Sequence, residues 1–238
     1  GMIAGGGGAG EGNVIAFNTG DGVTLISNAS ENDIRYNSIH SNGDLGIDHG
    51  NDGPDTNDAH DGDGNPNGHQ NYPVLTTAIY KSGSDQTTIS GTLNSLASTS
   101  FDISWYSNTV VDPSGWGEGE TYEGTSTWGT DPTGFANVSI VLNGNRRNAN
   151  ITATATRTAG LVTETSEFSA PVANNSPTAN ADTPVGAQED IPFTFDPRVN
   201  DTDPEMDTLT ITANSQPLPA QGTVDCTSGT SCTFNPVA

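Results

Sequence analysis

The stretch "NVIAFNTGDGV" at residues 13–23 is followed, 24 residues later, by "NSIHSNGDLGI" at residues 37–47. The two copies agree at five positions, namely Asn13 and Asn37, Ile15 and Ile39, Asn18 and Asn42, Gly22 and Gly46, and Val23 and Ile47. Five agreements at one offset indicate a stacked structural unit. The apolar runs are too short for helices, so short strands should point Ile15 and Ile39 inward, one above the other. Asparagines in register can hydrogen-bond along such a stack at its turns.

This pattern of "N-x-I-x-x-N" followed by "GDGV" or "DLGI" resembles the rungs of right-handed parallel β-helices, the fold of pectate lyases and of many bacterial surface proteins. The resemblance covers residues 1–48 and implies the last rungs of such a helix. Because the chain opens on "GMIAGGGGAG", which reads as the middle of a sequence, we expect a fragment of a large exported protein.

The composition favours thin β-layers over a helical bundle, since only 31% of the 238 residues are hydrophobic and 6% are aromatic. Twenty-nine acidic residues against six basic ones give a net charge of −23, which would repel phosphate backbones and anionic lipids. No run approaches the roughly 20 apolar residues of a membrane span. We therefore expect neither nucleic-acid binding nor membrane insertion.

Short strands rich in threonine begin at about Tyr72. Examples are "QTTISGTL" at residues 86–93 and "SFDISWYS" at residues 100–107, and turn residues separate the strands. About seven such strands in roughly 100 residues predict an immunoglobulin-like β-sandwich over residues 72–173. The order of coil, acidic loop and sandwich over residues 13–173 resembles a module pair of exported bacterial proteins, in which an immunoglobulin-like domain directly follows the last β-helix rung.

The C-terminal part has a third pattern. After a linker, "EDIPFTF" and "VNDTDPEMDTLTITA" are similar to bacterial cadherin-like repeats, which are sandwich modules strung in tandem on cell-surface adhesins. The segment is too short for a complete sandwich of that kind. The predicted fold class is therefore all-β, with parallel β-helix rungs at 1–48, an acidic loop at 49–71, the immunoglobulin-like β-sandwich at 72–173, a linker at 174–180 and a partial second sandwich at 181–238.

The acidic loop, "DHGNDGPDTNDAHDGDGNPNG" at residues 48–68, contains no lysine or arginine. Its candidate oxygen ligands are Asp52, Asp55, Asn57, Asp58, Asp61 and Asp63. Calcium accepts about 6 to 8 oxygens in irregular geometry, and the glycines let the backbone fold around an ion. The spacing does not match an EF-hand, so a calcium site and a solvated turn between domains are both open.

The cadherin-like resemblance implies a second calcium site, because such domains hold calcium on acidic groups near their junctions. The residues that match are Glu189, Asp201, Asp203 and Asp207. Glu205 and Met206 stand where many such repeats carry Asp and Gly, which changes the loop. An acidic turn between strands is the alternative interpretation of this segment.

The remaining candidate sites are a tryptophan in a loop and a pair of cysteines. Trp116 lies in the glycine-rich "DPSGWGEGETYEG", where an exposed ring could stack on a sugar; the alternative is that it anchors the loop. Trp105 and Trp128 are expected in the core. Cys226 and Cys232 flank a turn-like "TSGTS", which could bring them within disulfide reach, and a pair of free thiols is the alternative.

The chain shows no catalytic constellation that would identify an enzyme. β-Helix enzymes acting on acidic polysaccharides generally combine carboxylates with an Arg or Lys on one exposed sheet. The only basic residue of the coil segment is Arg35, which sits between rungs. The four histidines match no compact zinc motif.

We therefore expect a non-enzymatic, calcium-stabilised surface, adhesion or structural module, extracellular or on the bacterial cell surface. Its partners would be glycans or other surface proteins. The alternatives are the structural tail of a polysaccharide lyase or glycoside hydrolase, and a carbohydrate-binding module centred on Trp116.

Overall fold

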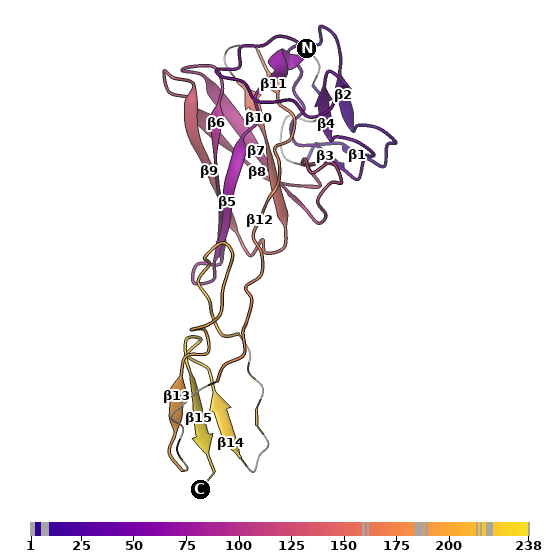
Figure 1. Ribbon diagram of the computed structural model, residues 1–238. Coiled ribbons are helices and arrows are strands. Elements are labelled where there is room, and N and C mark those ends of the chain that lie inside the picture. The colour runs from indigo at the N-terminus through magenta and orange to yellow at the C-terminus, as the bar shows by residue number, and fades with distance from the viewer. Residues whose placement is uncertain are drawn as a thin grey trace.

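The computed structural model describes residues 3–5, 10–158, 160, 162–183, 188, 190–212, 214, 216–217 and 221–237. These residues form strands and one short 3₁₀ turn, so the predicted all-β class is confirmed. The molecule is elongated (Figure 1): the N-terminal coil and a β-sandwich form one end, and a three-stranded sheet forms the other.

The N-terminal part is a coil of parallel strands. β1 (Val14–Ala16) pairs with β3 (Ser38–His40), and β2 (Val23–Leu25) pairs with β4 (Ile47–His49). Ile15 lies opposite Ile39, whose side chain is buried. The stacked 24-residue unit predicted from the repeat is thus confirmed.

The acidic loop is an insertion in this coil. The stacked asparagines beside β1 and β3, which form the first side of the coil, are 24 residues apart. The third side of the coil follows β2 and β4 in the chain, and there Asn32 hydrogen-bonds to Asn67, 35 residues later. The difference between 35 and 24 gives eleven extra residues in the second turn. The 3₁₀ turn η1 (Asn67–His69) brings the chain back onto the coil. The loop therefore leaves the coil and returns to it before the sandwich begins.

Two antiparallel sheets form the sandwich. The first contains β5 (Val74–Lys81), β6 (Gln86–Asn94) and β9 (Phe135–Asn143). The second contains β7 (Ser100–Asn108), β8 (Thr121–Gly129), β10 (Asn150–Arg157), β11 (Glu164–Thr165) and β12 (Val172–Ala173). Their facing side chains, including Ile89, Trp105 and Val138, make one core. Trp105 lies in this core and Trp128 packs against it, so the expectation that both tryptophans belong to the core is confirmed.

The segment at residues 166–172 is not one continuous strand. The structure has two short strands there, β11 and β12, with an irregular stretch between them. In that stretch the hydroxyls of Ser166 and Ser169 accept the N–H groups of Ala155 and Ala153. The serines keep the segment on β10 while Glu167 turns to the coil, so the strand is interrupted.

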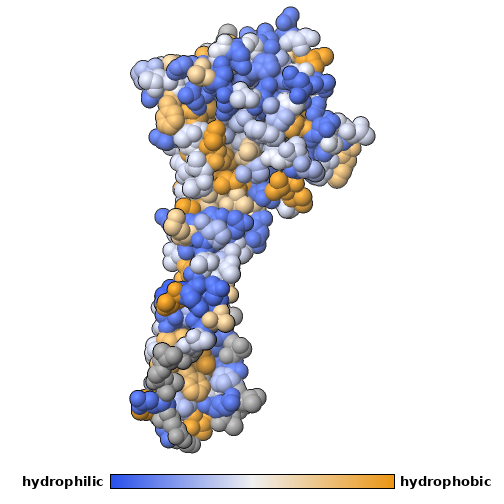
Figure 2. Space-filling model, in the orientation of Figure 1, coloured by the Kyte–Doolittle hydropathy of each residue, from blue (hydrophilic) through white to orange (hydrophobic). Residues whose placement is uncertain are grey.

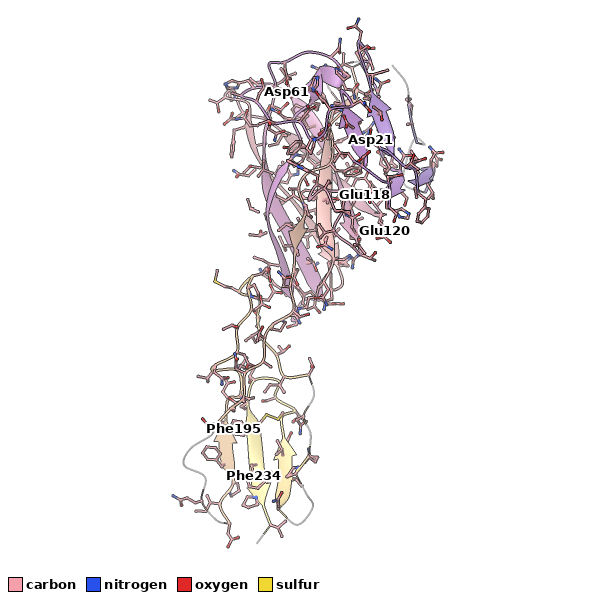
Figure 3. All side chains as sticks on the ribbon, turned by 45° about the vertical axis from the view of Figure 1, so that its right-hand side comes forward. Asp21, Asp61, Glu118, Glu120, Phe195 and Phe234 are labelled. Carbon is pink, nitrogen blue, oxygen red and sulfur yellow. A yellow bond between two sulfur atoms is a disulfide. The ribbon has the colours of Figure 1, made fainter. Side chains whose placement is uncertain are left out.

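The C-terminal unit is a sheet of β13 (Phe193–Phe195), β15 (Cys232–Pro236) and β14 (Gly222–Asp225). A disulfide joins Cys226 to Cys232. Phe195 and Phe234 lie on this sheet (Figure 3). A pocket of about 580 Å³ that opens to solvent borders this sheet and is lined in part by Phe195, Leu209 and Ile211.

Hydrophilic residues cover most of the visible face of the coil and sandwich (Figure 2). Among the described residues, no helix has the length and hydropathy of a membrane span.

Candidate functional site

A repeated asparagine contact runs along the coil. In each case one side-chain oxygen accepts both the backbone N–H and the side-chain NH₂ of the asparagine one turn earlier. Asn37 Oδ1 accepts from Asn13 at 2.9 and 3.1 Å, and Asn42 Oδ1 accepts from Asn18 at 3.3 and 2.8 Å. Asn67 Oδ1 makes the same pair of contacts with Asn32, at 2.9 and 3.2 Å. Successive turns of the coil are therefore joined by the same contact, in which one asparagine oxygen accepts two N–H groups from the asparagine of the turn before.

Glu118, from the loop before β8, repeats this contact at the end of the coil. Its Oε1 accepts the backbone N–H of Asn42 at 3.0 Å and the Nδ2 of Asn42 at 3.2 Å. Its Oε2 accepts the N–H of Ser41 at 2.6 Å. The carboxylate thus occupies the place that a next asparagine of the stack would take, between the coil and the sandwich (Figure 3). Because Glu118 is buried, its carboxylate loses hydrogen bonds to water, and these three protein donors replace them.

The neighbouring backbone closes the edge of β3. The N–H of Ile39 donates to the carbonyl of Gly119 at 2.8 Å, and the N–H of Gly119 donates back at 2.6 Å. This antiparallel bridge satisfies the polar groups that a last parallel strand would leave exposed. A Cβ at Gly119 would lie 2.6 Å from Phe168, so only glycine permits this approach.

An apolar cluster is shared by coil and sandwich. Coil residues Ile39 and Ile47 pack with Tyr106 and Phe168 of the sandwich, whose ring centroids are 5.2 Å apart. The residues of β10 from Ile151 to Thr156 are all buried, so both faces of this strand are covered. The two parts form one packed body.

Glu167 makes a second polar contact with the coil. Its Oε1 accepts the N–H of His49 at 2.8 Å, and its Oε2 accepts the N–H of Asp55 at 2.9 Å. Burial raises the pKa of Glu167 to about 8, against the opposing effect of these N–H groups. Burial also lowers the pKa of His49 to about 4, and nearby His69 adds to that effect. Among the described residues, neither ring nitrogen of His49 has a hydrogen-bond partner of normal distance and angle.

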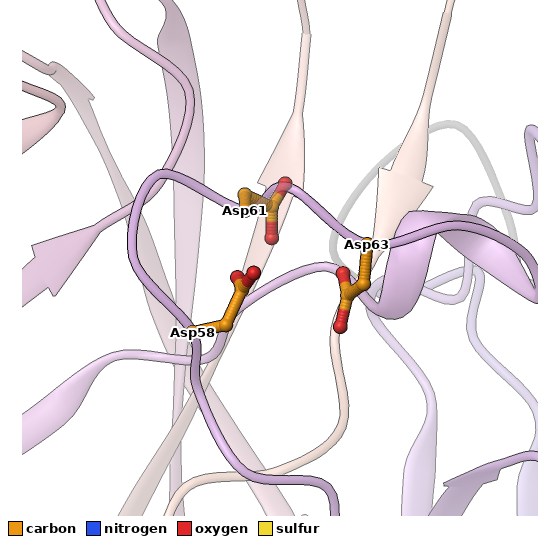
Figure 4. A group of neighbouring side chains, drawn as sticks. All are labelled: Asp58, Asp61 and Asp63. Carbon is orange, nitrogen blue, oxygen red and sulfur yellow. The ribbon is translucent and has the colours of Figure 1, made fainter.

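The structure brings three of the five candidate aspartates of the acidic loop together. Oxygens of Asp58, Asp61 and Asp63 lie within 4.8 Å of one another, and the side chains point toward a shared space (Figure 4). Burial raises the pKa of Asp61 to about 6, partly offset by the N–H of Asn71. No ion pair among the described residues involves these three carboxylates.

The other two aspartates lie elsewhere. Asp55 Oδ2 is 2.6 Å from Nδ1 of His69, and burial raises the pKa of Asp55. The carboxylate of Asp52 lies over Gly50. Neither joins the group formed by Asp58, Asp61 and Asp63.

The C-terminal candidates are dispersed. Glu189 lies outside the described residues. Asp201 accepts the N–H of Asn180, and Asp203 accepts the N–H groups of Glu205 and Asp207 within its own turn. In the described part of this unit, no three metal-ligating side chains come together.

Trp116 is half-buried and packs edge-on against Tyr72, with ring centroids 5.2 Å apart. The sequence reasoning missed Glu118, Glu167 and Phe168. A signal for Glu118 existed, because a stacked Asn42 needs an acceptor and "GWGEGE" places a carboxylate between glycines.

The C-terminal segment matches a known domain family. Residues 174–238 match the family model of a bacterial Ig domain. No curated protein matches the chain. The match falls on the segment for which a cadherin-like repeat was expected, and it makes that segment similar to the domains from which surface or structural modules are built.

Proposed function

We propose that this chain is a non-enzymatic structural module of an exported bacterial surface protein, in which an immunoglobulin-like sandwich ends a parallel β-helix. The observation that carries the proposal is the contact of Glu118 with Asn42. It reproduces the asparagine contact of the coil with a residue from a different part of the fold. The bacterial Ig match at residues 174–238 supports placement in a tandem surface protein.

The physical need for such a cap follows from the open end of a stack. The last turn of a parallel coil exposes unpaired N–H and C=O groups, which are a template for association with other chains. Glu118, Gly119 and Glu167 supply acceptors and donors to those groups, and Phe168 covers the apolar interior. The sandwich then lends rigidity to the coil.

Calcium and adhesion form the finer part of the proposal. A calcium ion held by Asp58, Asp61 and Asp63 would relieve repulsion among three close carboxylates and stiffen the inserted loop. The rigid module would space binding surfaces for glycans or for other surface proteins.

The cap is tested by comparing Glu118→Ala with Glu120→Ala, which removes the same charge two residues away. Glu118→Ala removes the acceptor of three donors, two of them on buried Asn42, so the free energy of unfolding should fall by about 2–4 kcal/mol. Amide hydrogen exchange should accelerate at Ser41 and Asn42 in that variant alone. Equal losses in both variants, with exchange at Asn42 unchanged, would overturn the capping role.

A further inference from the structure

We propose that the loop at residues 203–207 is a latch that holds the C-terminal unit in one orientation against the sandwich. Figure 1 shows a loop of the C-terminal unit reaching the lower end of β5. The proposal rests on Asp207, whose side chain is fully buried between the two parts of the molecule.

Among the described residues, the sandwich and the linker supply the partners of the Asp207 carboxylate. Its two carboxylate oxygens accept the backbone N–H of Tyr80, at 3.1 and 3.2 Å. One of them also accepts Nδ2 of Asn174 at 3.0 Å and lies 3.8 Å from the guanidinium of Arg147. An ionised carboxylate is costly to bury without such partners. Swinging the C-terminal unit away would therefore break several contacts of one buried charge together.

The latch also covers an exposed edge. Among the strands that the structure describes, β5 pairs with β6 alone, so it is an edge strand of its sheet. On its other side the N–H of Tyr80 donates to Asp207, and the carbonyl of Ala78 accepts Nδ2 of Asn174 at 2.6 Å. Uncovered edges of this kind pair with other chains. Asp207 of the loop and Asn174 of the linker together thus satisfy backbone groups of β5 that a further strand would otherwise pair with.

The loop is held at both of its ends. Asp203 Oδ1 accepts the N–H groups of Glu205 and Asp207, both at 3.0 Å. The carboxylate of Glu205 accepts the backbone N–H of Asn175 at 3.0 Å and its Nδ2 at 2.7 Å. This second attachment binds the loop to the linker, so the latch joins three segments of chain.

Protein groups already compensate the charge of Asp207. Its partners are N–H donors and a guanidinium that stacks over the Tyr80 ring, 5.1 Å from the ring centroid. The orientation of the C-terminal unit should therefore not depend on calcium, in contrast to the metal role that the sequence suggested for Asp207.

The test measures the distance between the two parts by electron spin resonance. Spin labels are placed at Ser84→Cys, after β5, and at Thr194→Cys, on β13, in the full chain with its disulfide intact. The otherwise unmodified chain should give one narrow distance distribution, unchanged by calcium or a chelator. Asp207→Asn, which puts an NH₂ group in place of an acceptor, should broaden it severalfold.

Asp225→Asn is the matched control, because it removes the same charge from an exposed site in the same unit. Arg147→Gln weakens the latch from the sandwich side and should give an intermediate broadening even if Asp207→Asn perturbs the C-terminal fold. The latch is overturned by a broad distribution in the unsubstituted chain, by a narrow one in Asp207→Asn, or by equal broadening in Asp225→Asn.

Discussion

Arg35 of the coil and Asp102 of the sandwich form an ion pair across the interface, with Nη1 2.7 Å from Oδ2. The same guanidinium holds Asp33 through Nε and Nη2, at 2.8 and 2.6 Å. Asp33 lies on the third side of the coil, opposite Ile3. One cation thus fixes the coil's own backbone and its position on β7.

Replacing Arg35 with Met should reduce the free energy of unfolding by about 1–3 kcal/mol, because the site is mostly buried and the carboxylates of Asp33 and Asp102 would both lose the guanidinium. A double-mutant cycle with Asp102→Asn, measured by chemical denaturation, isolates the pair from the Asp33 contact. Lys81→Met, at an exposed position, is the charge-matched control. A coupling energy near zero would mean that the pair contributes nothing to the interface.

Calcium should raise the melting temperature, because an ion that binds only the folded loop stabilises it by mass action. Changing Asp58, Asp61 and Asp63 together to Asn should abolish the rise, whereas changing Asp44, Asp182 and Asp225 should leave it intact. The pKa of Asp61, about 6, predicts a smaller calcium effect at pH 5 than at pH 7.5, since protons then compete for the site. Scanning calorimetry with calcium and with a chelator measures the rise in melting temperature in each variant and at each pH. An equal rise in both triple variants would show that calcium does not bind at Asp58, Asp61 and Asp63.

Acid should destabilise the coil–sandwich interface through His49. The folded pKa is about 4, below the ordinary 6.5, so the unfolded chain takes up the proton first. His49 therefore contributes a loss of stability of up to about 3 kcal/mol as pH falls from about 6.5 to 4, opposite in sign to Glu167, whose raised folded pKa of about 8 favours the folded state over the same range. His49→Leu removes this titrating group and leaves the others in place. The unfolding free energy of the variant should therefore fall less between pH 6.5 and pH 4 than that of the unsubstituted chain.

The control for His49 is His60→Asn on the exposed loop, since His60 has a positive φ that Asn tolerates. That variant should keep the full acid slope. If His49→Leu keeps it too, the acid sensitivity comes from other groups.

Gly119→Ala should destabilise the protein by about 1–3 kcal/mol through overpacking, because the new methyl group would meet Phe168 at 2.6 Å and Tyr106 at 2.9 Å. Phe168→Leu in the same chain should recover part of the loss by vacating that space. Gly83→Ala, where a Cβ meets nothing within 4 Å, should change unfolding by far less. Thermal and urea unfolding of the unsubstituted chain and these three variants measure the differences. If Gly119→Ala leaves the stability unchanged, the bridge to Ile39 can shift to make room for the methyl group.

The sequence predicted those elements whose signal is local or periodic. The 24-residue repeat located Ile15 opposite Ile39, and alternation in "QTTISGTL" located β6, with Ile89 and Leu93 buried. Both follow from the period of side chains along a strand.

The interface was not predictable in this way. Glu118 is 76 residues from Asn42, and Thr165 is 131 residues from Ile34, whose N–H it accepts at 2.9 Å. Single glutamates and threonines have no pattern that names a partner so distant. The acidic loop was recognised by composition, but its place as an insertion between Asn32 and Asn67 required the third side of the coil to be seen.

The separation between Ile34 and Thr165 also bears on how the protein is made. A chain that is synthesised from its N-terminus forms the coil strands long before the residues that close them exist. Contacts so far apart in sequence are slow to form, because a long loop must first be closed. The end of the coil therefore stays open to misassembly until Phe168 has emerged, and secretion in an unfolded form would postpone that risk until the whole module is outside the cell.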